Sequence, residues 1–172
     1  LDAAAAEAFN DRTGVYAGSG GGTYQINYDF FPLLTTAAGD LRTFGTELGS
    51  TVNPMWLLRT LPNNVLCHIG IRYGFKGANA CITNHATGGT LAIAEAAAAV
   101  RAGEVDRAVA VGHHAGLEPQ AGLYFQAFGL LGVDAVRPFD VSRNGSLHGE
   151  GAAALVLEDE AAARSRDASV LG

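Results

Sequence analysis

The stretch ANACITNHATGGTLAIAEAAAAVRAG, residues 78–103, predicts a strand that turns sharply into a helix. Residues 78–84 alternate small and apolar side chains as a buried strand does, and residues 90–103 form an alanine-rich helical segment that ends at Gly103. A second buried strand is predicted over residues 107–112. Strand, helix and strand in this order make a right-handed βαβ unit with a parallel sheet, so the chain is expected to have an α/β layered fold.

Sequence signals on either side of this unit predict the remaining elements. Residues 13–23 begin as a β-branched and aromatic strand and run into a glycine-rich bend. Asn53 is expected to cap a helix that begins at Pro54 and is broken by Pro62. The other expected elements are an irregular helix over 24–49, helices over about 63–73, 123–128 and 160–166, and a strand over 152–159.

The composition is that of an acidic domain without signs of a nucleic-acid or membrane partner. The 172 residues are 48% hydrophobic, which is enough for one core, and they are expected to form a single domain. Ten arginines and one lysine are scattered against a formal net charge of −6, which argues against a nucleic-acid surface. No uninterrupted apolar run is long enough for membrane insertion. Only two cysteines, Cys67 and Cys81, are present, which favours a reducing, cytoplasmic location.

Both ends of the chain resemble interrupted elements. Residues 1–9 have the composition of the end of a helix, and residues 168–172 resemble the start of a strand. Natural domains more often begin and end in polar, flexible residues, so the chain is expected to be a fragment of a longer protein.

The bend between the strand and the alanine-rich helix is a place where many enzymes carry a nucleophile. The first turn of a helix leaves backbone N–H groups unpaired and carries partial positive charge, which stabilises a thiolate. Neither a cysteine nor a serine stands at this bend. Cys81 lies well back in the strand, where a buried, inert thiol is expected.

Three segments carry a specific resemblance to a known family: NNVLCHIGIRYGFKGANACITN (63–84), VDRAVAVG (105–112) and RPFDVSRNGSLHGEGAAALVLED (137–159). They resemble successive segments of the β-ketoacyl-(acyl carrier protein) synthases, and the likeness runs from about Gly14 to the end of the chain. The resemblance implies a thiolase-like layered α/β/α fold, of which residues 1–172 are a single partial domain, the N-terminal half.

The resemblance also implies the chemistry of decarboxylative Claisen condensation. In this family a cysteine at the bend takes an acyl group as a thioester. Two histidines then help a malonyl-carrier extender to lose carbon dioxide and attack that thioester. Those histidines belong to the C-terminal half of the family fold, beyond Gly172.

On this resemblance the nucleophile of the family falls on Ala86. The family cysteine lies nine residues after the glycine of the K-G-P motif and seventeen before the glycine that closes the next helix, so Gly77 and Gly103 both give position 86. Matching HATG to the CATG-like tetrapeptide of the family places it at His85 instead, with a gap on each side. Neither residue has a thiol, so no acyl-enzyme thioester is expected, and an acyl-imidazole on His85 would hydrolyse readily.

The missing thiol leaves several functions open. Chain-length factors of the same family lack the cysteine, pair with a competent synthase and shape the pocket for the growing polyketide. Loading-module synthases carry glutamine there and only decarboxylate. The alanine at position 86 is typical of neither the chain-length factors nor the loading-module synthases. A non-catalytic thiolase-like scaffold is a further alternative, so the sequence does not decide whether the chain is an enzyme. The family implies a homodimer or a heterodimer that pairs near residues 79–84.

The family also implies the substrate carrier and several contact residues. No tightly bound cofactor is implied, because substrates arrive on the phosphopantetheine arm of an acyl carrier protein. Such carriers are acidic, so the basic residues Arg59, Arg72 and Lys76 are candidate contacts for the carrier. The pathway that the family implies is fatty acid or polyketide biosynthesis. Phe125 falls where the family has an apolar residue near the acyl chain, and core packing is an equally good account of it.

The histidines outside the bend have no predicted catalytic role. His113 and His114 are adjacent and cannot share one face of a strand, so no metal site is expected. His68 is expected to be packed in its helix. Ser146 and His148 replace apolar residues of the R-D-G-F-V-L-G segment of the family, which suggests a repacked cavity floor.

Overall fold

The computed structural model describes residues 3–20 and 30–172, except for the side chains of Leu57 and Arg59. The described residues belong to two compact units. The first unit comprises Leu1–Gly21, Pro62–His113 and Ala152–Gly172, and the second comprises Gly22–Leu61 and His114–Gly151. Among the helices in the described ranges, none is long and apolar enough to cross a membrane.

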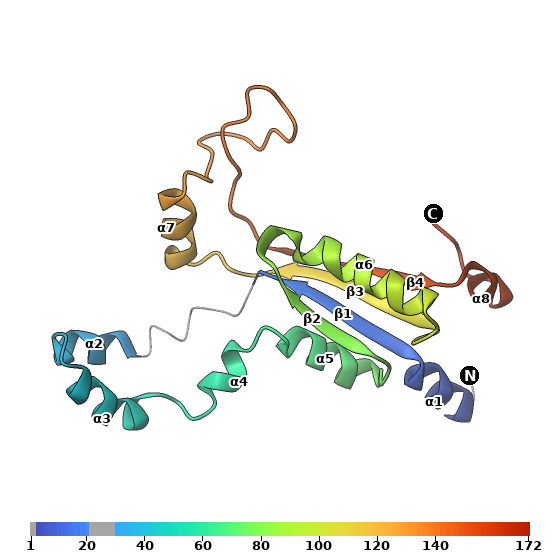
Figure 1. Ribbon diagram of the computed structural model, residues 1–172, viewed down its shortest axis with the longest axis horizontal. Helices are drawn as coiled ribbons and strands as arrows, with labels where there is room; N and C mark the ends of the chain where they lie inside the picture. The colour runs from blue at the N-terminus through green and yellow to red at the C-terminus, as the bar shows by residue number, and fades with distance from the viewer. Residues whose placement is uncertain (1–2, 21–29) are drawn as a thin grey trace. The chain divides into compact units, whose positions relative to one another are not determined.

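The first unit is built on a four-stranded sheet with the order β2-β1-β3-β4 (Figure 1). Its strands are β1 (Thr13–Ser19), β2 (Asn79–Thr83), β3 (Arg107–His114) and β4 (Gly151–Glu158). β1 pairs in parallel with both neighbours, and Val15 lies opposite Asn79 of β2 and Val109 of β3. The predicted parallel pairing is confirmed for β1, β2 and β3, with the addition that β1 lies between the two strands that flank the alanine-rich helix in the chain.

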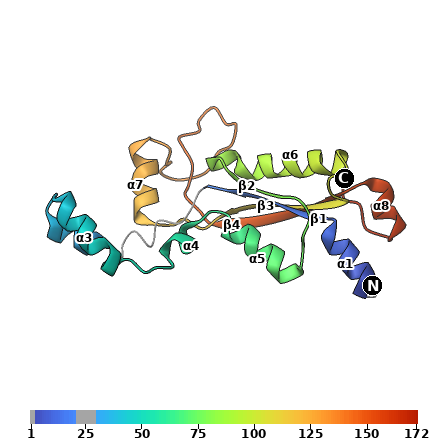
Figure 2. The same cartoon turned by 60° about the horizontal axis from the view of Figure 1, so that its bottom comes forward.

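β1 can lie between two other strands because both of its faces carry mostly small or apolar side chains. All of its residues are buried, and successive side chains point to opposite faces of the sheet. Val15 and Ala17 pack with Leu66 of α5 (Asn64–Tyr73), whereas Tyr16 packs with the alanines of α6 (Gly88–Arg101). Figure 2 shows α5 and α6 on opposite faces of the sheet, which confirms the layered α/β/α arrangement.

α6 contacts the sheet through a stripe of alanines. Ala92, Ala96 and Ala99 are buried and recur at spacings of four and three residues, so they share one face of the helix. This stripe packs against Tyr16 of β1 and Ala108 of β3. Because alanine is short, the helix lies close to the strands, and this close approach sets the position of its first turn.

The face of the sheet next to α5 leaves an apolar groove exposed. The groove is lined by α5, the residue that follows it, β3 and β4, and its lining residues are Ile69, Tyr73, Phe75, Val109, Val111 and Ala152–Ala154. Six consecutive residues of β4 are exposed before the strand becomes half-buried at its end. The apolar side chains of β4 therefore form a surface that the described residues leave exposed.

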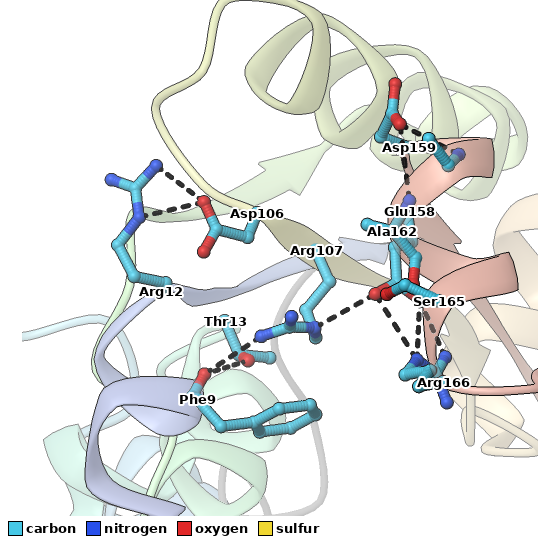
Figure 3. Close-up of polar contacts among 11 residues, drawn as sticks. Phe9, Arg12, Thr13, Asp106, Arg107, Glu158, Asp159, Ala162, Ser165 and Arg166 are labelled. Carbon is cyan, nitrogen blue, oxygen red and sulfur yellow. Dashed lines mark hydrogen bonds and ion pairs between the residues drawn. The ribbon is translucent and has the colours of Figure 1, made fainter. Parts of the chain in front are cut away.

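A polar cluster joins α1 (Ala3–Asp11) to β3 and β4 (Figure 3). The Arg107 guanidinium lies 3.9 Å from the centroid of the Phe9 ring, donates to the Phe9 carbonyl and pairs with Glu158. Arg166 pairs with the same carboxylate at 2.6 Å. The side chains of Arg107 and Glu158 are 14% and 5% exposed, so the pair is largely buried. We call these four residues the Arg107 cluster.

The hydrogen bond from Arg166 lowers the pKa of Glu158 below its ordinary value. Burial opposes this shift, and the positive charges of Arg166 and Arg107 reinforce it. The carboxylate is therefore held in its charged form by groups from two different segments of the chain.

The second unit contains α2 (Phe31–Ala37), α3 (Leu41–Thr51), α4 (Trp56–Thr60) and α7 (Pro119–Ala127). The predicted helix start at Pro54 is wrong, and α4 begins at Trp56. The Asn53 side chain accepts a hydrogen bond from the Met55 N–H at 2.8 Å, which stabilises a turn ahead of the helix in place of a helical first turn. The predicted helix over 123–128 is confirmed as α7, but it starts earlier, at Pro119.

Other predicted elements are confirmed in part. The expected irregular helix over 24–49 corresponds to α2 and α3, while residues 24–29 and the glycine-rich bend at 21–23 lie outside the described residues. α8 (Glu160–Ser165) begins where predicted, because the Asp159 side chain accepts from the N–H groups of its first turn. Residues 168–172, expected to begin a strand, have no regular secondary structure.

Candidate functional site

The bend predicted from the sequence is present at the junction of β2 and α6. β2 ends at Thr83, and the short 3-10 helix η2 (His85–Thr87) leads directly into α6. His85 has a φ of +38°, a left-handed conformation that is strained for a residue with a side chain. Strain of this kind clusters at active sites and ligand-binding turns, so this elbow is a candidate catalytic turn.

The first turn of α6 begins directly at the elbow, and the Gly88 N–H already donates to the carbonyl of His85. Thr87 is the N-cap residue, but its side chain donates to the carbonyl of Asn84 and makes no capping hydrogen bond. The positive end of the helix dipole is thus not neutralised by its own cap residue. A negatively charged group at this turn would be stabilised.

Glycines allow the elbow to lie directly on β1. A Cβ placed on Gly18 would lie 2.2 Å from the carbonyl carbon of Gly88, and one placed on Gly88 would lie 3.1 Å from the backbone of Ser19. Gly89 and Gly112 of β3 also lie close together, but a Cβ on either would be 3.3–3.5 Å from the other residue. Any side chain at Gly18 would push the first turn of α6 away from the sheet.

We therefore expect Gly18→Ala to lower the free energy of unfolding by about 1–3 kcal/mol or more, because the new methyl group meets backbone that has no room to move. Urea denaturation of the full-length protein measures the effect. Gly70→Ala, within α5, is the matched control, since a Cβ there makes only ordinary contact, at 3.5 Å from the Phe75 carbonyl oxygen. It should be neutral or stabilising by up to about 1 kcal/mol, as alanine favours a helix interior. Equal destabilisation by the two changes would contradict the packing account.

The two candidate positions of the nucleophile lie side by side in the elbow. His85 and Ala86 are both exposed. His85 carries the left-handed backbone, and Ala86 follows it toward the helix. A side chain at either position is accessible to a substrate, and neither natural side chain is a thiol.

The nearest cysteine along the chain is a poor substitute. Cys81 lies within β2 and is half-buried. Burial raises the pKa of its thiol, and the nearby Cys67 adds to the shift. Because the thiolate is the reactive form, this thiol is less nucleophilic than an ordinary one at neutral pH. The prediction of an inert thiol at Cys81 agrees with this geometry.

The predicted carrier contacts have different surroundings. Lys76 pairs with Asp11 at 3.0 Å and with Glu7 at 3.4 Å, and the Asp11 contact contributes most to raising its pKa. Arg72 is exposed in the last turn of α5, with its guanidinium 6.0 Å from the centroid of the Tyr73 ring. The side chain of Arg59 lies outside the described part of the chain. Of the two predicted contacts whose side chains the structure describes, Arg72 and Lys76, Lys76 is already paired with carboxylates.

The predicted acyl-pocket residue contacts a histidine. Phe125 of α7 is half-buried, and its ring meets that of His148 edge to face at a centroid distance of 5.0 Å. His148 in turn faces His114, with their Nε2 atoms 3.2 Å apart. The sequence does not predict this histidine pair, because the two residues are 34 positions apart. His68, expected to be packed, is exposed on α5 because it lies outside the stripe that faces the sheet.

Comparisons with known proteins agree on one family. Residues 2–163 match the family model of the beta-ketoacyl synthase N-terminal domain. The chain is 30% identical over 168 residues to 3-oxoacyl-[acyl-carrier-protein] synthase 2 of Staphylococcus aureus, an alignment that covers 93% of this chain and 38% of that protein.

Two solved structures have the same fold over nearly the whole chain. A beta-ketoacyl synthase from Burkholderia phymatum STM815 gives a TM-score of 0.71 at 25% identity, covering 95% of this chain and 39% of the other. The ishigamide ketosynthase/chain length factor gives a TM-score of 0.71 at 26% identity, covering 94% and 38%. The chain therefore spans less than half the length of these relatives.

Proposed function

The chain belongs to the beta-ketoacyl synthase family, and from this premise we propose that it is a member without its own nucleophile, acting as a chain-length-factor-like partner of a competent synthase. The observation that carries the proposal is an elbow with the backbone of a catalytic turn and no thiol. His85 is strained and Ala86 is exposed, yet neither can form a thioester. We take residues 1–172 as one partial domain of the larger family fold.

The position of the nucleophile is proposed to be Ala86, with His85 as the alternative. An alanine has no atom that can attack a carbonyl or hold an acyl group. A methyl side chain nevertheless leaves the entrance of the elbow open and apolar. This combination suits a chain that helps to form an acyl-binding site while another subunit carries the catalytic cysteine.

The proposed substrates are acyl groups on the phosphopantetheine arm of an acyl carrier protein in fatty acid or polyketide biosynthesis. Phe125 is proposed to border the acyl chain. Arg72 is the more available of the two described cations for an acidic carrier, because Lys76 is engaged by Glu7 and Asp11. A cytoplasmic location and the absence of a bound cofactor are part of the same proposal.

The proposed partner surface is the free edge of β2. This strand is outermost in the order β2-β1-β3-β4, so one side of its backbone has no neighbouring strand among the described residues. Unpaired strand edges are ready sites for pairing with a second chain. We propose that β2 pairs with the equivalent strand of a competent synthase, or with a second copy of this chain in a homodimer.

Mass spectrometry of the full-length protein tests this function directly. The protein is incubated with acyl-carrier thioesters, alone and with a candidate synthase partner, and the intact mass of each chain is measured. We expect no acyl adduct on this chain and labelling confined to the partner, because only the partner has a thiolate.

An acyl adduct on this chain would overturn the proposal and identify another nucleophile, with His85 the first residue to check by peptide mapping. Size-exclusion chromatography of the same samples tests the partner separately. A full-length protein that remains monomeric with the synthase would contradict the heterodimer, whatever the labelling shows.

A further inference from the structure

A pair of histidines in the second unit lies next to Phe125 and contributes no residue to the elbow. His114 lies at the end of β3, and His148 lies in the segment that precedes β4. Their Nε2 atoms are 3.2 Å apart, and their ring centroids are 5.5 Å apart. The rings therefore face each other through these nitrogens, with one hydrogen between two atoms that can each bind a metal ion.

The spacing of the two nitrogens fits two ligands of one ion. Zinc binds imidazole nitrogen at about 2.0–2.1 Å in tetrahedral geometry, which places two such ligands about 3.3–3.4 Å apart. The observed 3.2 Å is close to this spacing, and the rings must tilt from their head-on arrangement to turn both lone pairs toward a common ion. A metal ion would thus take the place of the shared hydrogen.

Neighbouring contacts hold the two rings in place. Phe125 supports His148 edge to face, and Gly116 lies so close to the His114 ring that a Cβ there would be 2.8 Å from its Cε1 atom. The N–H of Leu117 donates to the Glu150 carboxylate at 3.0 Å, which ties the segment after His114 to the segment after His148. The pair is therefore positioned before any ligand binds, which reduces the entropy lost on binding.

The histidine pair is partly open to solvent, and a buried carboxyl group lies four residues away in the sequence. Glu118, four residues after His114, is only 6% exposed, and neither of its carboxyl oxygens has a hydrogen-bond partner among the described residues. Both histidines are half-buried, so water can complete the coordination shell.

We propose that His114 and His148 bind one divalent transition-metal ion through their Nε2 atoms. Imidazole ligands select ions such as Zn²⁺, Ni²⁺ and Cu²⁺ over Mg²⁺ and Ca²⁺, which prefer oxygen. The residues that the structure describes contain no group of three or more metal ligands, so this ion has two protein ligands and open positions. Such a site binds reversibly and is separate from the elbow chemistry of the proposed function.

Equilibrium dialysis of the full-length protein against ZnCl₂, with metal measured by mass spectrometry, tests the site. We expect His114→Gln and His148→Leu each to reduce zinc affinity at least tenfold relative to the unchanged protein. His68→Gln is the matched control, because this exposed histidine lies on α5 away from the pair, and it should leave the affinity unchanged. Affinity should also fall as the pH is lowered, since protonated histidine cannot bind a metal.

X-ray absorption of the zinc-loaded, unchanged protein gives a second measurement that does not depend on the variants folding. We expect two imidazole nitrogens in the zinc shell, and both should disappear when His114 and His148 are replaced together. Zinc binding that is equal in the double variant and the unchanged protein would overturn the proposal. A zinc shell without imidazole would overturn it as well.

Discussion

Replacing Ala86 with cysteine should give a full-length protein that accepts an acyl group from an acyl-carrier thioester. Position 86 is exposed and stands at the entry of α6, where the helix dipole stabilises a thiolate. We expect intact-mass analysis to show a change from no adduct to about one acyl group per chain, because the new thiol is activated by its position. The adduct should be released by hydroxylamine, as a thioester is.

His85→Cys is the matched control, because it places the same thiol one residue earlier. His85 has the left-handed φ of +38°, so its side chain leaves the backbone in a different direction from that of Ala86. We expect little or no acylation of this variant. Reaction with iodoacetamide shows whether each thiol is accessible, and circular dichroism shows whether each variant is folded.

The two variants also test whether Ala86 or His85 occupies the position of the family nucleophile. Acylation of His85→Cys but not of Ala86→Cys would assign the nucleophile position to His85. If neither folded variant were acylated while both thiols reacted with iodoacetamide, the elbow would not be an acyl site in this protein, and the proposed function would fail with it.

The elements around the elbow could be predicted because their signals are local. Alternation over 78–84 predicted β2, observed as Asn79–Thr83, and the alanine-rich segment predicted α6. The helix starts at Gly88, two residues before the predicted 90, because η2 already turns the chain into the helical direction. Hydrophobic periodicity and helix-breaking residues are properties of a segment's own sequence, and they were sufficient to predict these segments.

The position of β1 between β2 and β3 could not be predicted from the same signals. Strand order depends on which faces become buried, and β1 is far from both neighbours in the sequence. The all-buried pattern of Thr13–Ser19, with alternating residues packed on α5 and α6, is the property that fixes it at the centre. A short strand with two small or apolar faces was visible in the sequence, but its partners were not.

The candidate site was predictable at the elbow and not elsewhere. Lys76 reads as a free cation in the sequence, but α1 brings Glu7 and Asp11 to it. His114 reads as half of an adjacent pair with His113, but its partner is His148, 34 residues away. In each case the side chain is paired with residues far away in the sequence, and no local sequence pattern indicates that pairing.

Removing the carboxylate of Glu158 should be the most destabilising change outside the core. Its side chain is 5% exposed, and it neutralises Arg107, which is 14% exposed and lies over Phe9. We expect Glu158→Gln to lower the free energy of unfolding by about 3–5 kcal/mol, because it leaves a buried guanidinium without its counter-charge. Urea denaturation of the full-length protein at neutral pH measures the loss.

Glu160→Gln provides the matched control two residues away. Glu160 pairs with Arg164, but both side chains are about two-thirds exposed, at 65% and 68%. Exposed pairs contribute about 0–1 kcal/mol, so this change should be close to neutral. Similar losses for the two variants would show that burial of the Arg107 cluster does not determine its contribution.

The effect of Glu158→Gln should depend on pH with a definite sign. The pKa of Glu158 is lowered in the folded protein relative to its ordinary value of 4.5, so the unfolded chain binds more protons in the range just below that value. The stabilisation is therefore fully present at neutral pH and is lost as the pH falls through 4.5 toward the lower folded pKa. The difference in unfolding free energy between the unchanged protein and Glu158→Gln should shrink over this range, whereas a difference that grows on acidification would contradict the role of the two arginines. Because Arg166 supplies the largest contribution to the lowered pKa, Arg166→Gln should weaken the pH dependence while leaving Arg107 paired.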